Sequence, residues 1–211
     1  MDNKEKLAEL IRRLPGIGPR QAKRIVYFLL ASNVQYTQDL AQTLSTLHQG
    51  VTSCSLCFRY FEERNTTNKD KKCSICSSRN RTPEHLMIVS RDIDLESIER
   101  SGTYNGFYFV LGGTIPLLHK NPEETIRMKN LANLLPFRIE QGLKEIIIAL
   151  DATPDGDHTG DFIIKNLKEI IKNTNKVVGI SNLGRGLSTG TELEYSDKET
   201  IKNALSSRFL S

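Results

Sequence analysis

The sequence predicts an α/β protein with a helical region at the front, a four-cysteine knuckle in the middle and a strand/helix tail. Three observations lead to this prediction. Apolar residues repeat at helical spacing near the start, the cysteines occur as two close pairs, and short apolar strands alternate with helices behind them. Such alternation favours a mainly parallel sheet covered by helices. The expected boundaries are 1–50, 51–85, 86–180 and 181–211.

The composition is that of a soluble globular chain. Its 211 residues are 38% hydrophobic and 26% charged, which is enough to bury a substantial core. No apolar run is long enough to cross a bilayer, and the first residues lack the apolar segment of a signal peptide. We therefore expect the protein to be in the cytoplasm, a compartment in which disulfides are disfavoured.

Charge is distributed unevenly along the chain, whose net charge is +4. Residues 1–85 contain 14 Lys/Arg and 8 Asp/Glu, whereas residues 86–211 contain 15 and 17. A basic front half is typical of a protein that binds a polyanion, and acidic clusters behind it could hold a divalent cation. Ordinary surface charge is the alternative.

The front half predicts three helices. The third helix is predicted near residues 37–49 and carries an apolar stripe. We expect it to end at Gly50, which would be its C-cap, and to pack on the other two helices. Residues 14–19, with the sequence Leu-Pro-Gly-Ile-Gly-Pro, separate the first helix from the second. The three apolar stripes are Leu7, Leu10, Ile11 and Leu14; Ala22, Ile25, Val26 and Leu29; and Leu40, Leu44 and Leu47.

The joint between the first two helices is the arrangement of a helix-hairpin-helix motif. Its two glycines let the turn present backbone N–H groups at the start of the second helix, where the helix dipole also favours an anion. The neighbouring cations could complete a phosphate clamp that grips a DNA backbone without reading bases. The alternative is a plain helical turn. The predicted DNA-binding residues are Gly16, Gly18, Arg20, Lys23 and Arg24.

The four cysteines predict a structural zinc site. Cys54 and Cys57 form one Cys-x-x-Cys pair, Cys73 and Cys76 form the other, and 15 residues separate the pairs. The polar loop between them cannot build its own core, so metal binding would supply its folding free energy. A redox role would need a thioredoxin-like setting, and two paired copies argue against it.

The back half alternates between short strands and helices. Ligands of such sheets bind at the carboxyl ends of the strands. The predicted strands are 86–89, 107–111, 145–150 and 177–180; the helices are 92–100, one that starts at Asn121, and 158–172.

An acidic segment follows the third of these strands. Asp151, Asp155 and Asp157 lie within seven residues, and Gly156 would allow a tight bend that brings the carboxylates together. Such a cluster suits a hard cation such as Mg²⁺. The alternative is a solvated turn whose last Asp caps the next helix.

The order of these parts resembles the RecR family of bacterial recombination mediators, whose α/β domain is of the Toprim type. The matching stretches are 104–113, 147–150, 190–195 and 200–208. The acidic positions depart from the family pattern. Ser90 stands where the family has Glu, Asp151 replaces the usual Asn, and two aspartates replace the two glutamates around Gly156. Thr153 also stands where Toprim enzymes carry the second Asp of a pair.

The resemblance implies a DNA-binding accessory protein of recombinational DNA repair, not an enzyme. Family members act with RecO and often RecF to load RecA onto single-stranded gaps, and form homo-oligomeric rings, usually tetramers, around duplex DNA. The resemblance also implies structural Zn²⁺, and the three aspartates become a site for Mg²⁺ or for docking a partner protein. One alternative is a Mg²⁺-dependent Toprim nuclease or primase-like enzyme using those aspartates. Another is a zinc-bearing adaptor without DNA contact.

Overall fold

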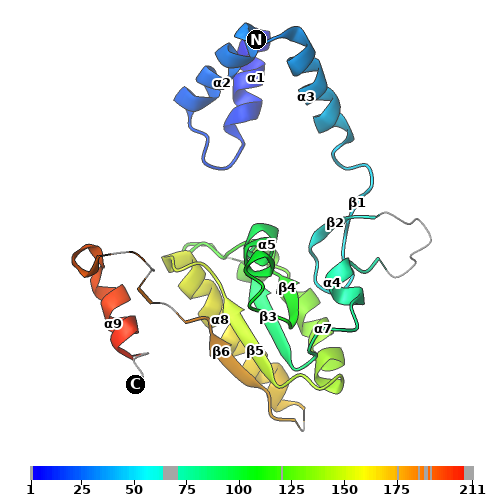
Figure 1. Ribbon diagram of the computed structural model, residues 1–211, viewed down its shortest axis with the longest axis vertical. Coiled ribbons are helices and arrows are strands. Elements are labelled where there is room, and N and C mark those ends of the chain that lie inside the picture. The colour runs from blue at the N-terminus through cyan, green and yellow to red at the C-terminus, as the bar shows by residue number, and fades with distance from the viewer. Residues whose placement is uncertain are drawn as a thin grey trace. The chain divides into compact units, whose positions relative to one another are not determined.

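The computed structural model describes residues 2–63, 71–119, 121–174, 176–184, 186–187, 190 and 192–206 (Figure 1). The chain forms two compact units, Met1–Val51 and Thr52–Ser211, and each is described by itself. The division into four parts stays a prediction. Among the described residues, no helix is both long and apolar enough to cross a membrane.

The first unit is helical, as predicted. Asp2 caps the first helix by accepting a hydrogen bond from the Lys4 amide, and Asn33 caps the third by accepting one from the Gln35 amide. The first two helices pack against each other around the buried side chains of Ala22 and Val26. The helices are α1 (Asn3–Arg12), α2 (Pro19–Ala31) and α3 (Val34–Thr46).

The third helix differs from its prediction. The Asn33 cap starts it earlier than expected, and it ends before Gly50, with Leu47 at the C-cap. It touches α2 through the rings of Phe28 and Tyr36, whose centroids lie 6.2 Å apart. Apart from this ring contact, the expected packing was wrong, because the apolar stripe of the third helix stays exposed among the described residues of the first unit. That stripe is Leu40, Leu44 and Leu47.

The second unit is built on a four-stranded sheet in which every neighbouring pair is parallel, in the order β4-β3-β5-β6. The predicted α/β class is therefore confirmed. Only the last strand is shifted by two residues, because Val177 is 96% exposed and the Gly179 amide is the first to bond the neighbouring strand, through the Lys144 carbonyl. The strands are β3 (His85–Val89), β4 (Phe107–Val110), β5 (Glu145–Ala149) and β6 (Gly179–Asn182).

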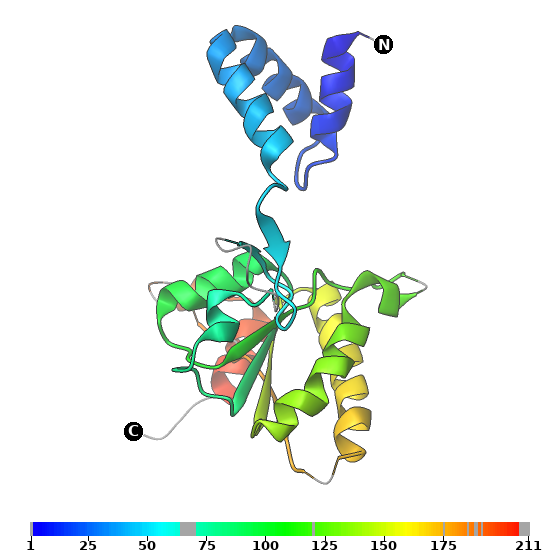
Figure 2. The same ribbon diagram turned by 90° about the vertical axis from the view of Figure 1, so that its right-hand side faces the viewer.

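Helices cover both faces of this sheet, with α5 on one side and α7 and α8 on the other (Figure 2). The predicted helix from Asn121 is a single turn, α6, and α7 follows it. A short hairpin and a one-turn helix carry the cysteines. The remaining elements are β1 (Val51–Ser53), β2 (Tyr60–Glu62), α4 (Ser74–Ser77), α5 (Asp92–Ser101), α6 (Pro122–Thr125), α7 (Met128–Glu140), α8 (Pro154–Lys172), η1 (Leu193–Tyr195) and α9 (Lys198–Ser206).

Candidate metal centre and nucleic-acid interface

The structure brings the four cysteines together. The Sγ atoms of Cys54, Cys57, Cys73 and Cys76 all lie within 4.8 Å of one another, and three of the four residues are buried. Among the described residues this is the one convergent group of three or more His, Cys, Asp and Glu side chains. Zn–S bonds of about 2.3 Å in a tetrahedron place the sulfurs about 3.8 Å apart. The Cys57 and Cys73 sulfurs are 3.6 Å apart, so the residues fit a tetrahedral metal ion.

Local backbone structure positions these sulfurs. The first pair lies between β1 and β2, where the Cys54 amide donates to the Arg59 carbonyl at 2.9 Å and Phe58 adopts a left-handed φ of 61°. The Cys73 amide donates to the Cys54 sulfur at 3.4 Å, which ties the second pair to the first. Hydrogen bonds from the other thiols lower the pKa of Cys54, which favours its thiolate form.

Hydrogen bonds that the sequence did not indicate join the knuckle to the sheet. The Val110 amide, in edge strand β4, donates to the Cys57 carbonyl at 2.8 Å. The Arg127 guanidinium donates to the carbonyls of Phe58 and Val110 at 3.1 and 3.0 Å. On the α5 side, the Tyr60 amide donates to the Asp92 carboxylate at 2.7 Å. The four-cysteine site is therefore built into the edge of the α/β unit.

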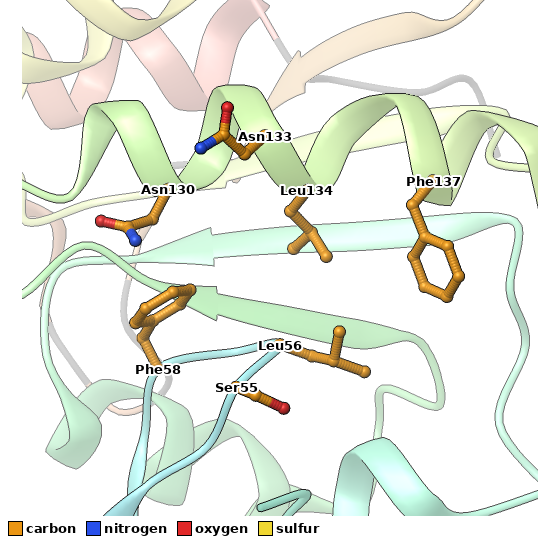
Figure 3. A pocket seen from close by; sticks show the side chains of 7 residues that line it. All are labelled: Ser55, Leu56, Phe58, Asn130, Asn133, Leu134 and Phe137. Carbon is orange, nitrogen blue, oxygen red and sulfur yellow. The ribbon is translucent and has the colours of Figure 1, made fainter. Parts of the chain in front are cut away.

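A pocket of about 270 Å³ separates the knuckle from α7 (Figure 3). Leu56 and Phe58 line it on the knuckle side, and Leu134 and Phe137 line it on the helix side. The full lining is four apolar and three uncharged polar side chains: Ser55, Leu56, Phe58, Asn130, Asn133, Leu134 and Phe137. These groups offer packing surface and not acid–base or metal chemistry.

The predicted hairpin is present between α1 and α2. Gly16 has a φ of 75°, in the left-handed region, and the Ile17 amide donates to the Leu14 carbonyl at 3.2 Å. Gly18 is the N-cap of α2 and Pro19 its first residue. Glycine has no capping side chain and proline has no N–H, so the amides of Arg20 and the next residue begin the set of donors that the helix itself leaves unbonded.

Three exposed cations lie on the first two turns of α2. Arg20, Lys23 and Arg24 follow the hairpin at a spacing that places them on neighbouring positions of one helix surface. Within the described part of the chain none of them has an ion-pair partner. The structure therefore places all five predicted DNA-binding residues in one short segment, next to the amides of a helix N-terminus.

The acidic segment differs from the predicted turn. The helix α8 begins at Pro154 and not at residue 158, because the Thr153 hydroxyl caps it by accepting from the Gly156 amide at 3.1 Å. Asp155 and Asp157 therefore lie in the first helical turn. Gly156 does not make a bend: it is buried, and a Cβ atom there would lie 2.0 Å from the Asp151 carbonyl oxygen.

The three aspartates are not gathered into a metal site. Asp155 accepts a hydrogen bond of 3.1 Å from the Leu117 amide, and its own carbonyl accepts from the Thr159 hydroxyl. That hydroxyl accepts in turn from the Ile115 amide at 2.8 Å. Asp155 thus fixes the loop after β4. Although all three aspartates are described, they do not form a convergent metal-holding group.

A different pair of acids, Asp94 and Asp151, interacts electrostatically near the carboxyl end of the sheet. Burial raises the pKa of Asp94 and the Asp151 carboxylate raises it further, against a hydrogen bond from the Arg91 amide that lowers it. Ser90 directly follows strand β3 and is fully buried, and its hydroxyl has no hydrogen-bond partner among the described residues. A serine therefore occupies the position at which the resemblance leads one to expect a glutamate.

Comparison with known proteins agrees with this architecture. Residues 4–48 match the family model described as RecR, helix-hairpin-helix, and residues 84–178 match the Toprim domain model. Three similar proteins, from Ureaplasma parvum, Cereibacter sphaeroides and Neorickettsia sennetsu, each carry the name Recombination protein RecR.

These relatives match over nearly their whole length. The Ureaplasma protein is 34% identical over 201 residues, which are 95% of this chain and 92% of the relative. The Cereibacter protein is 35% identical over 97% of this chain and 94% of its own. The Neorickettsia protein is 33% identical over 99% and 98%. This chain is therefore a member of the RecR family of recombination proteins.

Proposed function

We propose that this protein is a non-catalytic, DNA-binding mediator of recombinational DNA repair that acts with RecO and RecF to load RecA on single-stranded gaps. Family membership supports a role in recombination, because the relatives are named as recombination proteins. The observation that carries DNA binding is the cluster of exposed cations, Arg20, Lys23 and Arg24, beside the hairpin that matches the RecR model.

The proposed contact is with the phosphate backbone of duplex DNA and of junctions between single and double strands. The hairpin shaped by Gly16 and Gly18 brings a phosphate to the amides that open α2, and the three cations neutralise it. Such contacts position a protein on DNA without reading its sequence. The mediator would therefore recognise the form of a DNA structure and not its bases.

We further propose that the protein works as a homo-oligomeric ring, in the form of a tetramer. The support is the apolar surface of the first unit, where α1 buries none of its residues and large side chains remain exposed. A second copy of the chain would cover them. Several weak backbone grips in one ring would then bind a duplex through avidity. These exposed side chains include Leu10, Leu14, Phe28, Leu30, Leu44 and Leu47.

We propose Zn²⁺ as the ion of the four-cysteine centre, because four thiolates in a tetrahedron favour zinc and leave no position for a substrate. Zinc would supply folding free energy to the knuckle and no chemistry. Asp151, Asp155 and Asp157 are proposed as docking groups for a basic surface of a partner. We do not assign them a preformed Mg²⁺ site, because Asp155 is already bonded to the Leu117 amide. The expected compartment is the cytoplasm.

The test is charge reversal of α2 in the full-length protein. Lys23→Glu with Arg24→Glu should weaken binding about tenfold or more and lower the salt slope of binding by about 2, since two phosphate contacts are lost. Fluorescence anisotropy on duplex, single-stranded and gapped DNA, with and without Mg²⁺ and RecO, measures both quantities.

Lys165→Glu with Lys168→Glu is the matched control, because it changes the net charge equally on exposed positions of α8. It should bind DNA like the wild type. Equal affinity of the α2 variant and the wild type would contradict the proposal. Mg²⁺-dependent strand cleavage or primer synthesis that disappears in Asp155→Ala would favour the enzyme alternative instead.

A further inference from the structure

A pocket of about 350 Å³ opens on one side of α2, beside the hairpin. Sites that take small ligands usually have volumes of about 300–1,000 Å³. The pocket belongs in part to the proposed DNA grip, because Ile17 lies in the hairpin and Arg24 is one of the three exposed cations. Its lining combines three apolar side chains with one carboxamide and one guanidinium: Ile17, Gln21, Arg24, Ile25 and Phe28.

Arg24 lies between the pocket and the other two cations of α2. With about 3.6 residues per turn, Arg20 and Lys23 fall on one side of Arg24 around the circumference of the helix. Phe28 and Gln21 fall on its other side. A DNA phosphate held by Arg24 would therefore lie at the edge of the pocket. The group nearest to that phosphate in the DNA strand is the nucleoside to which it is bonded.

Phe28 supplies an aromatic ring to the pocket. Its side chain is 60% exposed. Its contact with Tyr36 is edge-to-face, with an interplanar angle of 81°, and a single neighbouring ring covers at most one face of Phe28. The half-buried side chains of Ile17 and Ile25 add apolar surface to the same pocket. Bases of any identity stack on aromatic rings, so this lining fits a planar nucleobase without selecting among the four.

Gln21 supplies a hydrogen-bonding group. Its side chain folds toward the hairpin, because its Oε1 atom lies 2.9 Å from the position of a Cβ atom added at Gly18. A carboxamide both donates and accepts hydrogen bonds, so it can bond to the edge of any base. The pocket would therefore recognise the presence of a base and not its identity.

The charge of the lining favours a nucleotide over an apolar side chain from a second copy of the chain. No acidic side chain lines the pocket, and Arg24 has no ion-pair partner within the described part of the chain. An apolar group seated there would desolvate the guanidinium without a negative charge to compensate it. A nucleotide brings its own phosphate. The base must be unpaired, since a paired base would first have to leave the duplex stack.

We propose that this pocket binds an unpaired nucleobase next to a phosphate held by Arg24, so that the first unit distinguishes a junction between single and double strands from an uninterrupted duplex. This inference rests on the proposed DNA grip of α2 and adds a base site to it. Phe28 would then contact DNA and not a second copy. The other exposed apolar side chains of the first unit do not line the pocket and remain available to the contact between copies.

Two DNA substrates of equal charge test the site in the wild-type, full-length protein. Both are the same duplex with a single-stranded extension of the same length, but in one of them the extension is abasic and keeps only its sugar–phosphate backbone. The extension with bases should bind about 5- to 150-fold more tightly, the usual effect of stacking one base on an aromatic ring. This ratio should change little with salt concentration, because both extensions have the same number of phosphates.

Three variants assign this preference to the pocket. Phe28→Leu removes the ring and keeps an apolar side chain, so it should bind the two extensions equally and blunt duplex as the wild type does. Phe28→Tyr keeps a ring and should retain the preference. Tyr27→Leu is the matched control, because it removes an exposed ring one residue away that does not line the pocket, and it should also retain the preference. Light scattering on each variant measures the oligomeric state.

Equal binding of the two extensions by the wild type would overturn the base site and leave the phosphate grip intact. A preference that survives in Phe28→Leu, or that Tyr27→Leu removes as completely, would overturn it as well. A smaller oligomer in Phe28→Leu would assign the pocket to a second copy and would also overturn the base site. A wild-type protein that binds neither blunt duplex nor either extension would overturn the base site and the α2 grip together.

Discussion

The backbone amide of Val110 donates a hydrogen bond of 2.8 Å to the carbonyl oxygen of Cys57. Val110 belongs to β4, the edge strand of the parallel sheet, and it is fully buried. An unprotected edge would expose a row of backbone groups, and the knuckle covers part of it. The metal centre and the edge of the sheet should therefore be stabilised together.

If the four cysteines hold Zn²⁺ as proposed, its removal should expose this edge first. Chelation removes the folding free energy of the knuckle, so the Val110 amide loses its acceptor and should exchange with solvent faster. The Ile88 amide, in the central strand β3, is the internal control and should keep its protection. Hydrogen exchange read by NMR, with zinc added back to restore protection, measures both. Unchanged exchange at Val110 would contradict the structural role of the metal.

Gly156→Ala should destabilise the α/β unit. Its Cβ would lie 2.0 Å from the Asp151 carbonyl oxygen, a backbone atom that cannot move without shifting the strand end. Overpacking of this kind costs about 1–3 kcal/mol. Gly160→Ala is the matched control in the same helix, because its Cβ would make ordinary contacts at 3.8 and 3.9 Å. It should be neutral or stabilise the helix by about 0.5–1 kcal/mol.

Urea unfolding of the two α8 variants provides the measurement. A free energy of unfolding that falls equally in Gly156→Ala and Gly160→Ala would show that helix propensity and not the close approach decides the effect. A fall confined to Gly156→Ala would show that this glycine is required for α8 to begin next to the end of β5.

Gly16→Ala should strain the hairpin without filling any space. The φ of Gly16 is 75°, and an added Cβ would meet nothing within 4 Å. An alanine in the left-handed region of φ/ψ space costs about 1–2 kcal/mol, and the hairpin can relieve this strain by changing its conformation. DNA affinity in the anisotropy assay should therefore fall together with stability.

Gly50→Ala is the control for that experiment. Gly50 has nearly the same φ, 78°, and equally open surroundings, but it lies outside the hairpin. Its substitution should cost similar stability and leave DNA affinity unchanged. Equal losses of DNA affinity in the two variants would argue against a specific role of the hairpin.

Local patterns predicted most of this fold. The hairpin, the cysteine pairs and the β3–β5 strands each carry a short-range signal, either glycine placement, ligand spacing or a run of apolar residues. The helix predicted from Asn121 is divided into α6 and α7, and Pro136 inside α7 weakens the helical pattern there. The start of α8 was placed too late, because Pro154 and Gly156 suggested a turn although Pro154 is also a typical first helical residue.

Other features could not be read from the sequence at all. Arg138 has no neighbour in the sequence that marks it as buried, yet it is 2% exposed and its guanidinium lies 4.0 Å from the centroid of the Phe107 ring. The same holds for Asp155, whose bond to the Leu117 amide decides that it is a structural residue. Such roles depend on tertiary contacts, which cannot be read from hydrophobic periodicity or from the spacing of residues in a motif.

Glu99 should make stability depend on pH. Its carboxylate accepts a hydrogen bond of 2.8 Å from Arg81 and one of 2.7 Å from the Tyr108 hydroxyl. The Arg81 bond lowers the pKa of Glu99, with a smaller lowering from Tyr108 and an opposing effect of burial. The folded pKa is thus below the unfolded value of about 4.3. The stabilisation is therefore fully present above the unfolded pKa and is lost as the pH falls through the folded pKa.

Glu99→Gln tests this relationship. At pH 7 the variant should lose about 1.5–3 kcal/mol of unfolding free energy, the usual range for a hydrogen bond to a charged group. The difference from the wild type should shrink as the pH falls below 4, where the wild-type carboxylate becomes protonated. Glu84→Gln, at an exposed ion pair with Lys144, is the control and should show a much smaller change because solvent screens that pair. If the Glu99→Gln difference persisted unchanged at low pH, the charge of Glu99 would not be what stabilises the protein, and the hydrogen-bond geometry alone would have to account for the effect.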